Sequence, residues 1–372
     1  MKLLVISGAP FIFKGEKSFA YSPYVKELVV WEKHVKDISF CCPVWKNENG
    51  LLIEEIPFQF RKHYKLIDFN LSSFLNIVKS FFSAFFNMLI IMKAMNDADH
   101  IHLRCPGNMG LLGCIIQILF PSKKKTAKYA GNWDPKSKQP LTYRMQKWIL
   151  NNTFLTRNMQ VLVYGEWENQ SKNIKSFFTA TYSDLEKEVV LKDKKSAEKT
   201  FIFVGTLAHG KNPMYAVKLI EELIKNDNRA ILHIFGEGIE RARLENYIKK
   251  NQLEKFVFLH GNQNKETLKH FYKKSHFMIL PSKSEGWPKA IAEGMFWGCV
   301  PLATNVSCVP FMIDYGKRGV LLEMNIEEDI TQVQAIISDQ DRFEEMSTLA
   351  FNWSQNYTVE RFESEIEKLL VK

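Results

Sequence analysis

Short apolar runs alternate with longer stretches of helical periodicity along most of the chain. In the first half, the strand-like runs are Leu3–Ser7, Ile38–Cys42, His100–Arg104, Thr126–Ala130 and Val161–Tyr164. In the second half, they are Thr200–Val204, Ala230–Phe235, Val257–His260, Phe277–Leu280 and Val300–Ala303. Helical stretches such as Pro213–Lys225 and Ile239–Asn251 separate most of these runs. The alternation predicts an α/β fold in which helices cover both faces of parallel sheets.

The length of the chain indicates more than one domain, because 372 residues exceed what one hydrophobic core of ordinary size holds. The polar segment Leu191–Lys199 separates the two series of strands and is the natural linker. A charged surface loop within one domain is the alternative. We therefore predict two doubly wound domains, residues 1–190 and residues 200–354.

The composition is that of a folded globular protein, with 46% hydrophobic and 24% charged residues. The net charge of +9 is unevenly distributed. Residues 1–195 carry 28 Lys and Arg against 17 Asp and Glu, whereas residues 196–372 carry 22 against 24. This asymmetry predicts that the first half meets an anionic partner, either a membrane surface or an anionic acceptor. Nucleic acid is not expected, because no stacking platform or groove-reading helix is apparent.

Four features bear on location. The six cysteines show no metal-ligand spacing and are predicted to be buried thiols in a reducing cytoplasm. The run Met1–Gly8 is too short for a signal peptide and predicts a buried first strand. The apolar stretch Phe74–Met92 contains several polar residues, which favours a buried or membrane-facing helix over a span. The basic cluster Pro121–Lys125, after an apolar run, suits either an anionic bilayer or a solvated loop. We expect a cytoplasmic protein that can sit at the inner face of the cell membrane.

The segment Pro281–Thr304 carries the strongest candidate chemistry. It follows the strand-like run Phe277–Leu280, and open α/β sheets bind ligands at the carboxyl ends of their strands. Pro288 suits the first position of a helix, and Gly298 marks its end. The first N–H groups of this helix, expected from Lys289 and Ala290, favour a phosphate.

Two glutamates flank the predicted helix start. Glu293 lies five residues beyond Pro288, roughly 7.5 Å along a helix axis. This is about the distance from the phosphates of a nucleotide to its ribose. A carboxylate there could accept hydrogen bonds from the ribose hydroxyls. Glu285 lies before the helix, where a sugar attached to the phosphates should lie, and Gly286 permits a close backbone approach. Two glutamates at this spacing also occur on solvated helix faces.

The segment resembles the Glu-x7-Glu signature of the retaining family-4 glycosyltransferases, which have the GT-B fold of two Rossmann-like domains with a cleft between them. The resemblance implies that Glu285 contacts the donor sugar, that Glu293 contacts the ribose, and that Gly286 and Trp287 supply backbone contacts. It also implies that the last helix, at about 355–372, packs back on the first domain.

Further segments are similar to donor-binding parts of that family. The run Phe201–Lys211 looks like the strand and glycine loop that carry an Arg and a Lys to the diphosphate. Lys211 falls in the lysine position, whereas Thr206 stands where the family has arginine. The implied donor-binding set is Gly205, Thr206, Lys211, Gly236, Gly238, Asn262, Glu285, Gly286, Trp287, Pro288, Lys289 and Glu293. A plain tight turn is the alternative for Gly236 and Gly238.

Three strands of the first half end in candidate acceptor loops, Ser7–Pro10, Leu103–Asn108 and Ala130–Asp134, which should open on one edge of the sheet. His100, His102 and Arg104 alternate and should share one face of their strand. The candidate acceptor-side residues are Gly8, Arg104, Asn132 and Asp134, with Trp133 against the apolar face of a sugar. A structural ion pair of Arg104, a core position for His102 and a plain surface turn at Asp134 are the alternatives. No residue is assigned to the histidine that the family often has in this domain.

Together these features predict a glycosyltransferase that moves a sugar from a nucleotide-diphosphate sugar to a glycan or lipid-linked acceptor, in the synthesis of cell-surface polysaccharide such as capsule or exopolysaccharide. Glu285 and Lys211 are the predicted catalytic residues. No cofactor and no metal ion is expected, because the sequence has no metal-ligand cluster. Two alternatives stay open: an inactive glycosyltransferase-like partner at the membrane, which Thr206 would favour, and a sugar-nucleotide epimerase on the same fold.

Overall fold

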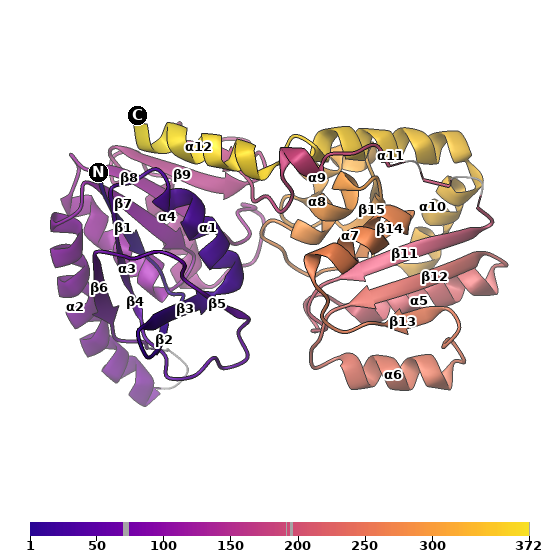
Figure 1. Ribbon diagram of the computed structural model, residues 1–372, viewed down its shortest axis with the longest axis horizontal. Coiled ribbons are helices and arrows are strands. Elements are labelled where there is room, and N and C mark those ends of the chain that lie inside the picture. Colours follow the sequence, from indigo (N-terminus) through magenta and orange to yellow (C-terminus); the bar gives the residue numbers. More distant parts are fainter. Residues whose placement is uncertain (70–73, 191, 194–195, 372) are drawn as a thin grey trace. The chain divides into compact units, whose positions relative to one another are not determined.

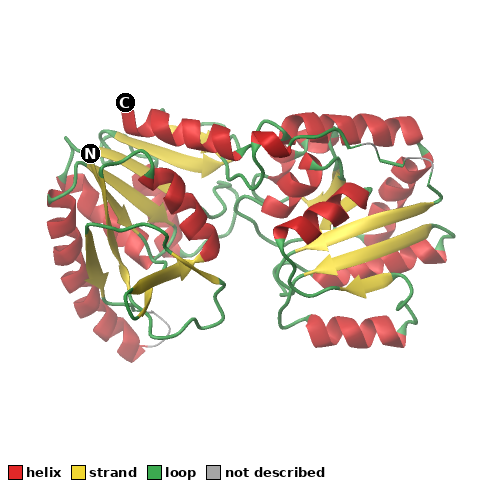
Figure 2. Ribbon diagram, viewed as in Figure 1, coloured by secondary structure: helices red, strands yellow, loops and turns green. Residues whose placement is uncertain are grey.

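The computed structural model describes residues 1–69, 74–190, 192–193 and 196–371 (Figure 1). The chain folds into a first compact unit, Met1–Phe177 with Glu363–Lys372, and a second one, Phe178–Phe362. The division falls after Phe177, ahead of the expected linker Leu191–Lys199, of which residues 191, 194 and 195 lie outside the described residues. Each unit is built on its own parallel sheet with helices around it (Figure 2).

The first unit contains a seven-stranded parallel sheet in the order β10-β9-β8-β7-β1-β4-β6. Its strands are β1 (Lys2–Ile6), β4 (Asp37–Pro43), β6 (Lys62–Leu66), β7 (His100–Cys105), β8 (Lys124–Tyr129), β9 (Met159–Tyr164) and β10 (Ile174–Phe177). Five of them, β1, β4, β7, β8 and β9, match the predicted runs. Of these, β1, β4 and β9 are largely continuous apolar segments, as expected of strands buried on both faces. A small antiparallel sheet of β2 (Ile12–Lys14), β3 (Lys17–Tyr21) and β5 (Ile53–Glu55) was not predicted.

Three helices cover one face of this sheet: α2 (Phe74–Asn96), α3 (Asn108–Ile116) and α4 (Leu141–Leu150). Their buried residues join those of the alternate strand positions, such as Leu4, Ile101 and Leu103, in one hydrophobic cluster. α3 packs between α2 and α4, so the three helices form a single layer. The short 3₁₀ helix η1 (Gln117–Leu119) continues α3. Among the described residues, we find no helix whose length and hydropathy would let it cross a bilayer.

The opposite face of the same sheet meets α1 (Ser22–Glu32), whose Trp31 ring lies 4.3 Å from the ring of His102. His100 and His102 both contact the hydroxyl of Thr126, at 3.0 and 2.8 Å, which confirms that they share a face. The ion pairs of Lys33 and Lys175 with Glu363 and Glu365 hold the last residues of the chain on this unit.

The second unit contains a six-stranded parallel sheet in the order β13-β12-β11-β14-β15-β16. Its strands are β11 (Glu198–Val204), β12 (Arg229–Phe235), β13 (Val257–Leu259), β14 (Phe277–Leu280), β15 (Val300–Thr304) and β16 (Val320–Leu322). Numbered by their order in this unit, the strands follow 3-2-1-4-5-6, the Rossmann order, and the chain reverses direction across the sheet between β11 and β14. Ligands of such sheets bind outside the strand ends at this switch point.

The helices of the second unit are α5 (Pro213–Lys225), α6 (Arg241–Lys250), α7 (Lys265–Lys274), α8 (Lys289–Phe296), α9 (Val309–Met312), α10 (Ile326–Ser338) and α11 (Gln340–Ser354), with 3₁₀ helices η2 (Asp184–Glu186) and η3 (Asp314–Gly316). α5 has the predicted bounds, and α6 is two residues shorter at its start and one at its end. The last helix, α12 (Val359–Val371), begins in the second unit and ends in the first.

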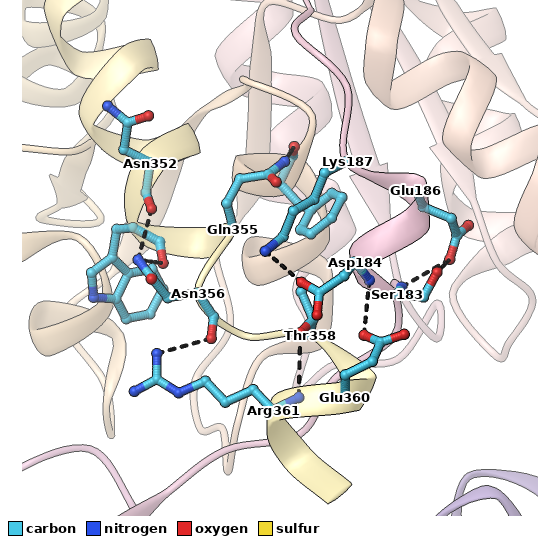
Figure 3. A network of polar contacts seen from close by, with 12 residues as sticks. Ser183, Asp184, Glu186, Lys187, Asn352, Gln355, Asn356, Thr358, Glu360 and Arg361 are labelled. Carbon is cyan, nitrogen blue, oxygen red and sulfur yellow. Dashed lines mark hydrogen bonds and ion pairs between the residues drawn. The ribbon is translucent and has the colours of Figure 1, made fainter. Parts of the chain in front are cut away.

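A polar network fixes the start of α12 against η2 (Figure 3). The backbone N–H of Asp184 donates to the Glu360 carboxylate at 2.8 Å, and the carboxylate of Asp184 pairs with Lys187 at 2.5 Å. Ser183 and Glu186 form a reciprocal capping box around η2. The first turn of α12 is therefore fixed to a segment that lies 176 residues earlier in the chain.

Candidate functional site

The candidate site lies where two loops leave the switch point of the second sheet. The first loop, residues 205–212, follows β11, and the second, residues 281–288, follows β14. The N–H of Lys283 donates to the carbonyl of Gly210 at 2.8 Å and joins the two loops. The ammonium of Lys211 lies 2.5 Å from a carboxylate oxygen of Glu285. The structure thus brings together the two residues predicted to be catalytic, one from each loop.

The pair differs in exposure, because the side chain of Glu285 is 6% exposed and that of Lys211 is 31% exposed. A buried carboxylate needs a counter-charge, and Lys211 provides it, so the two side chains neutralise each other. Lys211 keeps an open side, from which a further anion can approach it. An incoming phosphate would compete with Glu285 for the ammonium and would release the carboxylate to accept hydroxyl groups.

The loop that carries Glu285 is held from behind by the end of β15 and by the turn after it. The hydroxyl of Thr304 donates to the carbonyl of Ser282. The carbonyl of Gly286 accepts from the Ser307 hydroxyl at 3.2 Å and from the Cys308 thiol at 3.1 Å. These contacts turn the carbonyl oxygens of the loop toward the protein. Its geometry is therefore set before any ligand binds, which is what a positioning loop requires.

Helix α8 follows this loop directly, and its start differs slightly from the prediction. It begins at Lys289, so Pro288 caps it instead of occupying its first position. The first backbone hydrogen bond of the helix runs from the N–H of Ile291 to the carbonyl of Pro288, at 3.0 Å. The N–H of Ala290 comes before this bond in the chain. At the other end, Gly298 has φ +75° and the N–H of Cys299 donates to Gly294 at 2.8 Å, which confirms the predicted glycine stop.

Trp287 uses its side chain for packing. The indole is 7% exposed and lies 5.4 Å from the ring of Tyr357 and 6.2 Å from the indole of Trp353. Contacts of Trp287 with a donor would therefore come from its backbone, as the resemblance implies. The aromatic cluster anchors the loop between Glu285 and α8.

Glu293 lies on the second turn of α8 and is partly exposed. The hydroxyl of Thr181 donates to one of its carboxylate oxygens at 2.8 Å, and the phenol of Tyr272 donates to the other at 3.3 Å. Burial disfavours the charge and raises the pKa of Glu293. A carboxylate has about four acceptor positions, so two hydroxyl donors leave room for others. Sequence reasoning missed Thr181 and Tyr272, which lie in distant segments without a motif.

The predicted donor glycines have a structural reason of their own. Gly236 has φ +141°, and a Cβ placed on it would lie 1.9 Å from the carbonyl oxygen of Gly205. Gly238 has φ +157°, and its Cβ would lie 2.4 Å from the carbonyl oxygen of Leu207. The loop after β12 therefore presses against the loop after β11, and only glycine allows this approach. Thr206 and Asn262 are exposed at the ends of β11 and β13.

The acceptor-side predictions meet a different environment. The guanidinium of Arg104 lies 2.9 Å from a carboxylate oxygen of the buried Glu27 and 4.5 Å above the ring of Tyr24. The other oxygen of Glu27 accepts from Lys128 at 2.9 Å. Arg104 therefore has the structural ion pair that was its alternative interpretation. His102 is 1% exposed, as expected of a core histidine.

The loop after β8 is closed by short-range bonds. The side chain of Asn132 accepts from the N–H of Asp134, and the carboxylate of Asp134 accepts from the N–H of Lys136, both at 2.8 Å. Trp133 is 1% exposed, and its indole donates to Gln170 at 2.9 Å. The prediction that Trp133 holds a sugar face is therefore wrong, because the ring is part of the hydrophobic core. A Cβ placed on Gly8 would meet open space, so that position stays accessible.

The match of the second unit to known proteins agrees with this geometry. Residues 186–353 match the family model described as glycosyl transferases group 1. The second unit belongs to this family. An uncharacterised glycosyltransferase of Haemophilus influenzae is 29% identical over 178 residues, which are 47% of this chain and 50% of that protein. The Escherichia coli UDP-Gal:alpha-D-GlcNAc-diphosphoundecaprenol alpha-1,3-galactosyltransferase is 28% identical over 158 residues, 41% of this chain and 40% of that enzyme.

The chain spans about half the length of the curated relatives it matches. A likeness over the whole chain comes from a solved structure. HepE of Anabaena, in complex with UDP and glucose, covers 100% of this chain and 99% of its own, with a TM-score of 0.68 at 12% identity. The group 1 glycosyltransferase unit and the Rossmann-like unit before it therefore form the GT-B fold, as predicted.

Proposed function

We propose that the protein transfers a sugar from a nucleotide-diphosphate sugar to an acceptor hydroxyl, with retention of the anomeric configuration. The observation that carries the proposal is the Lys211–Glu285 pair at the switch point, directly before the start of α8. A cation, the first amides of a helix and a carboxylate are the groups that a diphosphate attached to a sugar needs. The complex of HepE with UDP and glucose supports a UDP-linked donor as the first to test.

In the proposed reaction, the bond between the anomeric carbon and the phosphate oxygen breaks, and the electron pair leaves with the nucleoside diphosphate. The acceptor oxygen forms the new bond on the same face, and its proton passes to the departing phosphate. Lys211 and the start of α8 stabilise the charge that grows on the β-phosphate. Glu285 orients the sugar hydroxyls, and Glu293 accepts hydrogen bonds from the ribose hydroxyls. That the reaction needs no divalent ion stays a prediction.

The acceptor is proposed to be a glycan or a lipid-linked sugar, in the synthesis of cell-surface polysaccharide. The E. coli relative, named for a diphosphoundecaprenol-linked acceptor, supports a lipid-linked one. The basic first half supports a place at the inner face of the cell membrane, since anionic lipid attracts such a surface. The acceptor-side residues Gly8, Asn132 and Asp134 stay predictions.

A thermal-shift panel of UDP-, GDP-, ADP- and CMP-linked sugars tests the donor site. One nucleotide class should stabilise the wild-type protein, and Glu293→Ala should lose most of that shift. Glu254→Ala, an exposed change on the same unit, is the matched control and should keep it. An equal shift in all three proteins would remove Glu293 from the ribose role. Release of free sugar and nucleotide without any acceptor would favour the epimerase alternative, and donor binding without turnover would favour the inactive one.

A further inference from the structure

The outer surface of α2 is apolar over residues 81–92 although it faces solvent. Every exposed position from residue 81 to residue 92 carries Phe, Leu or Met. The exposed fractions are 74%, 61%, 50% and 53% for Phe81, Phe82, Phe85 and Phe86, and 44% and 38% for Leu89 and Met92. These spacings place all six residues on one side of the helix. The opposite side, including Ile91, Ala94 and Met95, packs into the core of the first unit.

Further exposed apolar side chains lie on other elements of the same helix layer. α2, α3 and α4 form one layer on the sheet, and η1 and α4 add further exposed apolar side chains to it. Leu119 is 63% exposed, Leu141 is 76% exposed and Trp148 is 63% exposed. Phe154, in the loop after α4, is 71% exposed. We call this surface, Phe81, Phe82, Phe85, Phe86, Leu89, Met92, Leu119, Leu141, Met145, Trp148 and Phe154, the apolar face.

The size of the apolar face separates it from scattered surface residues. An aromatic side chain offers about 150–250 Å². The exposed parts of the four α2 phenylalanines alone therefore amount to roughly 500 Å², which already matches the largest apolar patch of a typical soluble monomer, about 300–600 Å². The other residues of the apolar face add to this area, and exposed apolar patches above that range are typical of interaction surfaces.

The charges around the apolar face select that occupant. No Asp or Glu occurs in residues 69–96 or in residues 135–165. Exposed cations follow the same segments, including Lys93, Lys138 and Arg144. The guanidinium of Arg157 lies 4.7 Å above the ring of Phe154, so a cation borders this exposed aromatic side chain. Aromatic and aliphatic side chains with a cationic rim suit the boundary between acyl chains and anionic headgroups.

A basic pocket of about 590 Å³ adjoins this surface at the amino ends of β8, β9 and β10. Lys124, Arg157 and Lys172 line it, and its lining residues include no Asp or Glu. Thr153 lines both this pocket and a second one of about 520 Å³ that reaches Trp148. The headgroup side of the surface is therefore cationic as well.

We propose that the apolar face is the membrane-docking surface of the protein. It inserts into the boundary between headgroups and acyl chains of the facing leaflet of an anionic bilayer, without crossing the bilayer. The proposal extends the membrane location proposed above and rests on it for the choice of occupant. An acceptor sugar carried on a lipid would then be met at the bilayer surface, where its lipid holds it.

Vesicle co-sedimentation tests the proposal with the full chain and vesicles of phosphatidylethanolamine and phosphatidylglycerol. The wild-type protein should bind, and vesicles of phosphatidylcholine alone should bind it at least tenfold more weakly. Phe82→Glu/Phe86→Glu should lose binding at least tenfold. Leu185→Glu/Ile239→Glu is the matched control, because these residues are 96% and 78% exposed but lie on the second unit, and it should bind like the wild type.

Three further measurements separate the outcomes. Brominated lipid should quench the fluorescence of the wild-type protein more than that of Trp148→Phe, which reports insertion of α4. Thermal shift by nucleotide should be the same in Phe82→Glu/Phe86→Glu as in the wild type, so that loss of docking is distinguished from loss of the donor site or of the fold. Equal vesicle binding by both double variants would overturn the proposal. A dimer of the wild type without lipid, detected by sedimentation equilibrium and absent in Phe82→Glu/Phe86→Glu, would also overturn it, because the apolar face would then bind a second copy.

Discussion

Gly236→Ala tests how the two loops of the donor site are held together. The added Cβ would lie 1.9 Å from the carbonyl oxygen of Gly205, whereas real Cβ atoms stay at least 3.0 Å from such an atom. The loops would have to separate by about 1 Å. Three backbone bonds span this region: Gly205 N–H to Phe235 at 2.9 Å, Leu207 N–H to Glu237 at 3.0 Å and Gly236 N–H to Gly261 at 2.9 Å. A stretch of about 1 Å takes a bond of that length outside the range of hydrogen bonds.

The expected cost follows from these contacts. The two bonds that join the β11 and β12 segments, from Gly205 to Phe235 and from Leu207 to Glu237, would be lost at a cost of about 1 kcal/mol each. The φ of +141° adds about 1–3 kcal/mol for a residue with a Cβ. We expect the free energy of unfolding of the second unit to fall by about 3–5 kcal/mol, which for a unit of this size lowers its Tm by about 10 °C.

Urea and thermal melts of the full chain measure this change. Gly210→Ala is the matched control in the loop after β11, because its added Cβ meets nothing within 4 Å and its φ lies outside the left-handed region. The control should unfold within roughly 0.5 kcal/mol of the wild type. A Gly236→Ala protein that melts like the control would refute the argument that backbone contact requires glycine there.

Three further changes probe charges and the donor site. Glu27→Gln should lower the free energy of unfolding by about 3–5 kcal/mol at pH 7, because it leaves Arg104 and Lys128 buried without a counter-charge. Burial opposes ionisation of Glu27, but the two cations outweigh it and hold the pKa of Glu27 well below its usual range. The difference in the free energy of unfolding between variant and wild type should therefore be full above about pH 5 and shrink as the pH falls further. A constant difference in urea melts down to pH 3 contradicts this. Glu293→Gln should melt higher than the wild type at pH 8 but not at pH 4, because burial raises the pKa of Glu293 and its ionised form destabilises the fold. The same variant should bind nucleoside diphosphate about tenfold more weakly by titration calorimetry, and equal affinity would count against a ribose contact. Thr206→Arg should strengthen that binding about five- to tenfold by adding a cation at the end of β11; unchanged affinity would mean that residue 206 does not face the phosphates.

The sequence predicted those parts of the fold that depend on burial alone. Strands such as β1 and β14 are apolar and buried on both faces, so each is a short continuous apolar run in the sequence. The missed strands are short or lie at edges. β6 contains two lysines within five residues, and β2, β3 and β5 form a small antiparallel sheet whose pairing depends on contacts between distant segments.

The candidate site divides in the same way. Lys211 and Glu285 were predicted from local motifs, and the structure places them 2.5 Å apart. Thr181 and Tyr272 contact Glu293 from segments 112 and 21 residues away, and nothing local marks them. Arg104 could not be assigned from sequence, because its partner Glu27 lies on another element. The pattern of side chains on α2 indicated a helix that is buried or faces a membrane, and only the fold shows which of its sides packs in the core.

Hydrogen–deuterium exchange of the full chain, with and without a saturating nucleoside diphosphate, tests the central claim that the loops at the β11–β14 switch point receive the diphosphate. Slower exchange of backbone amides should concentrate in residues 205–212 and 282–293. Protection confined to the basic pocket of the first unit, around residues 122–125 and 157–175, with unchanged exchange in the two loops, would contradict the claim.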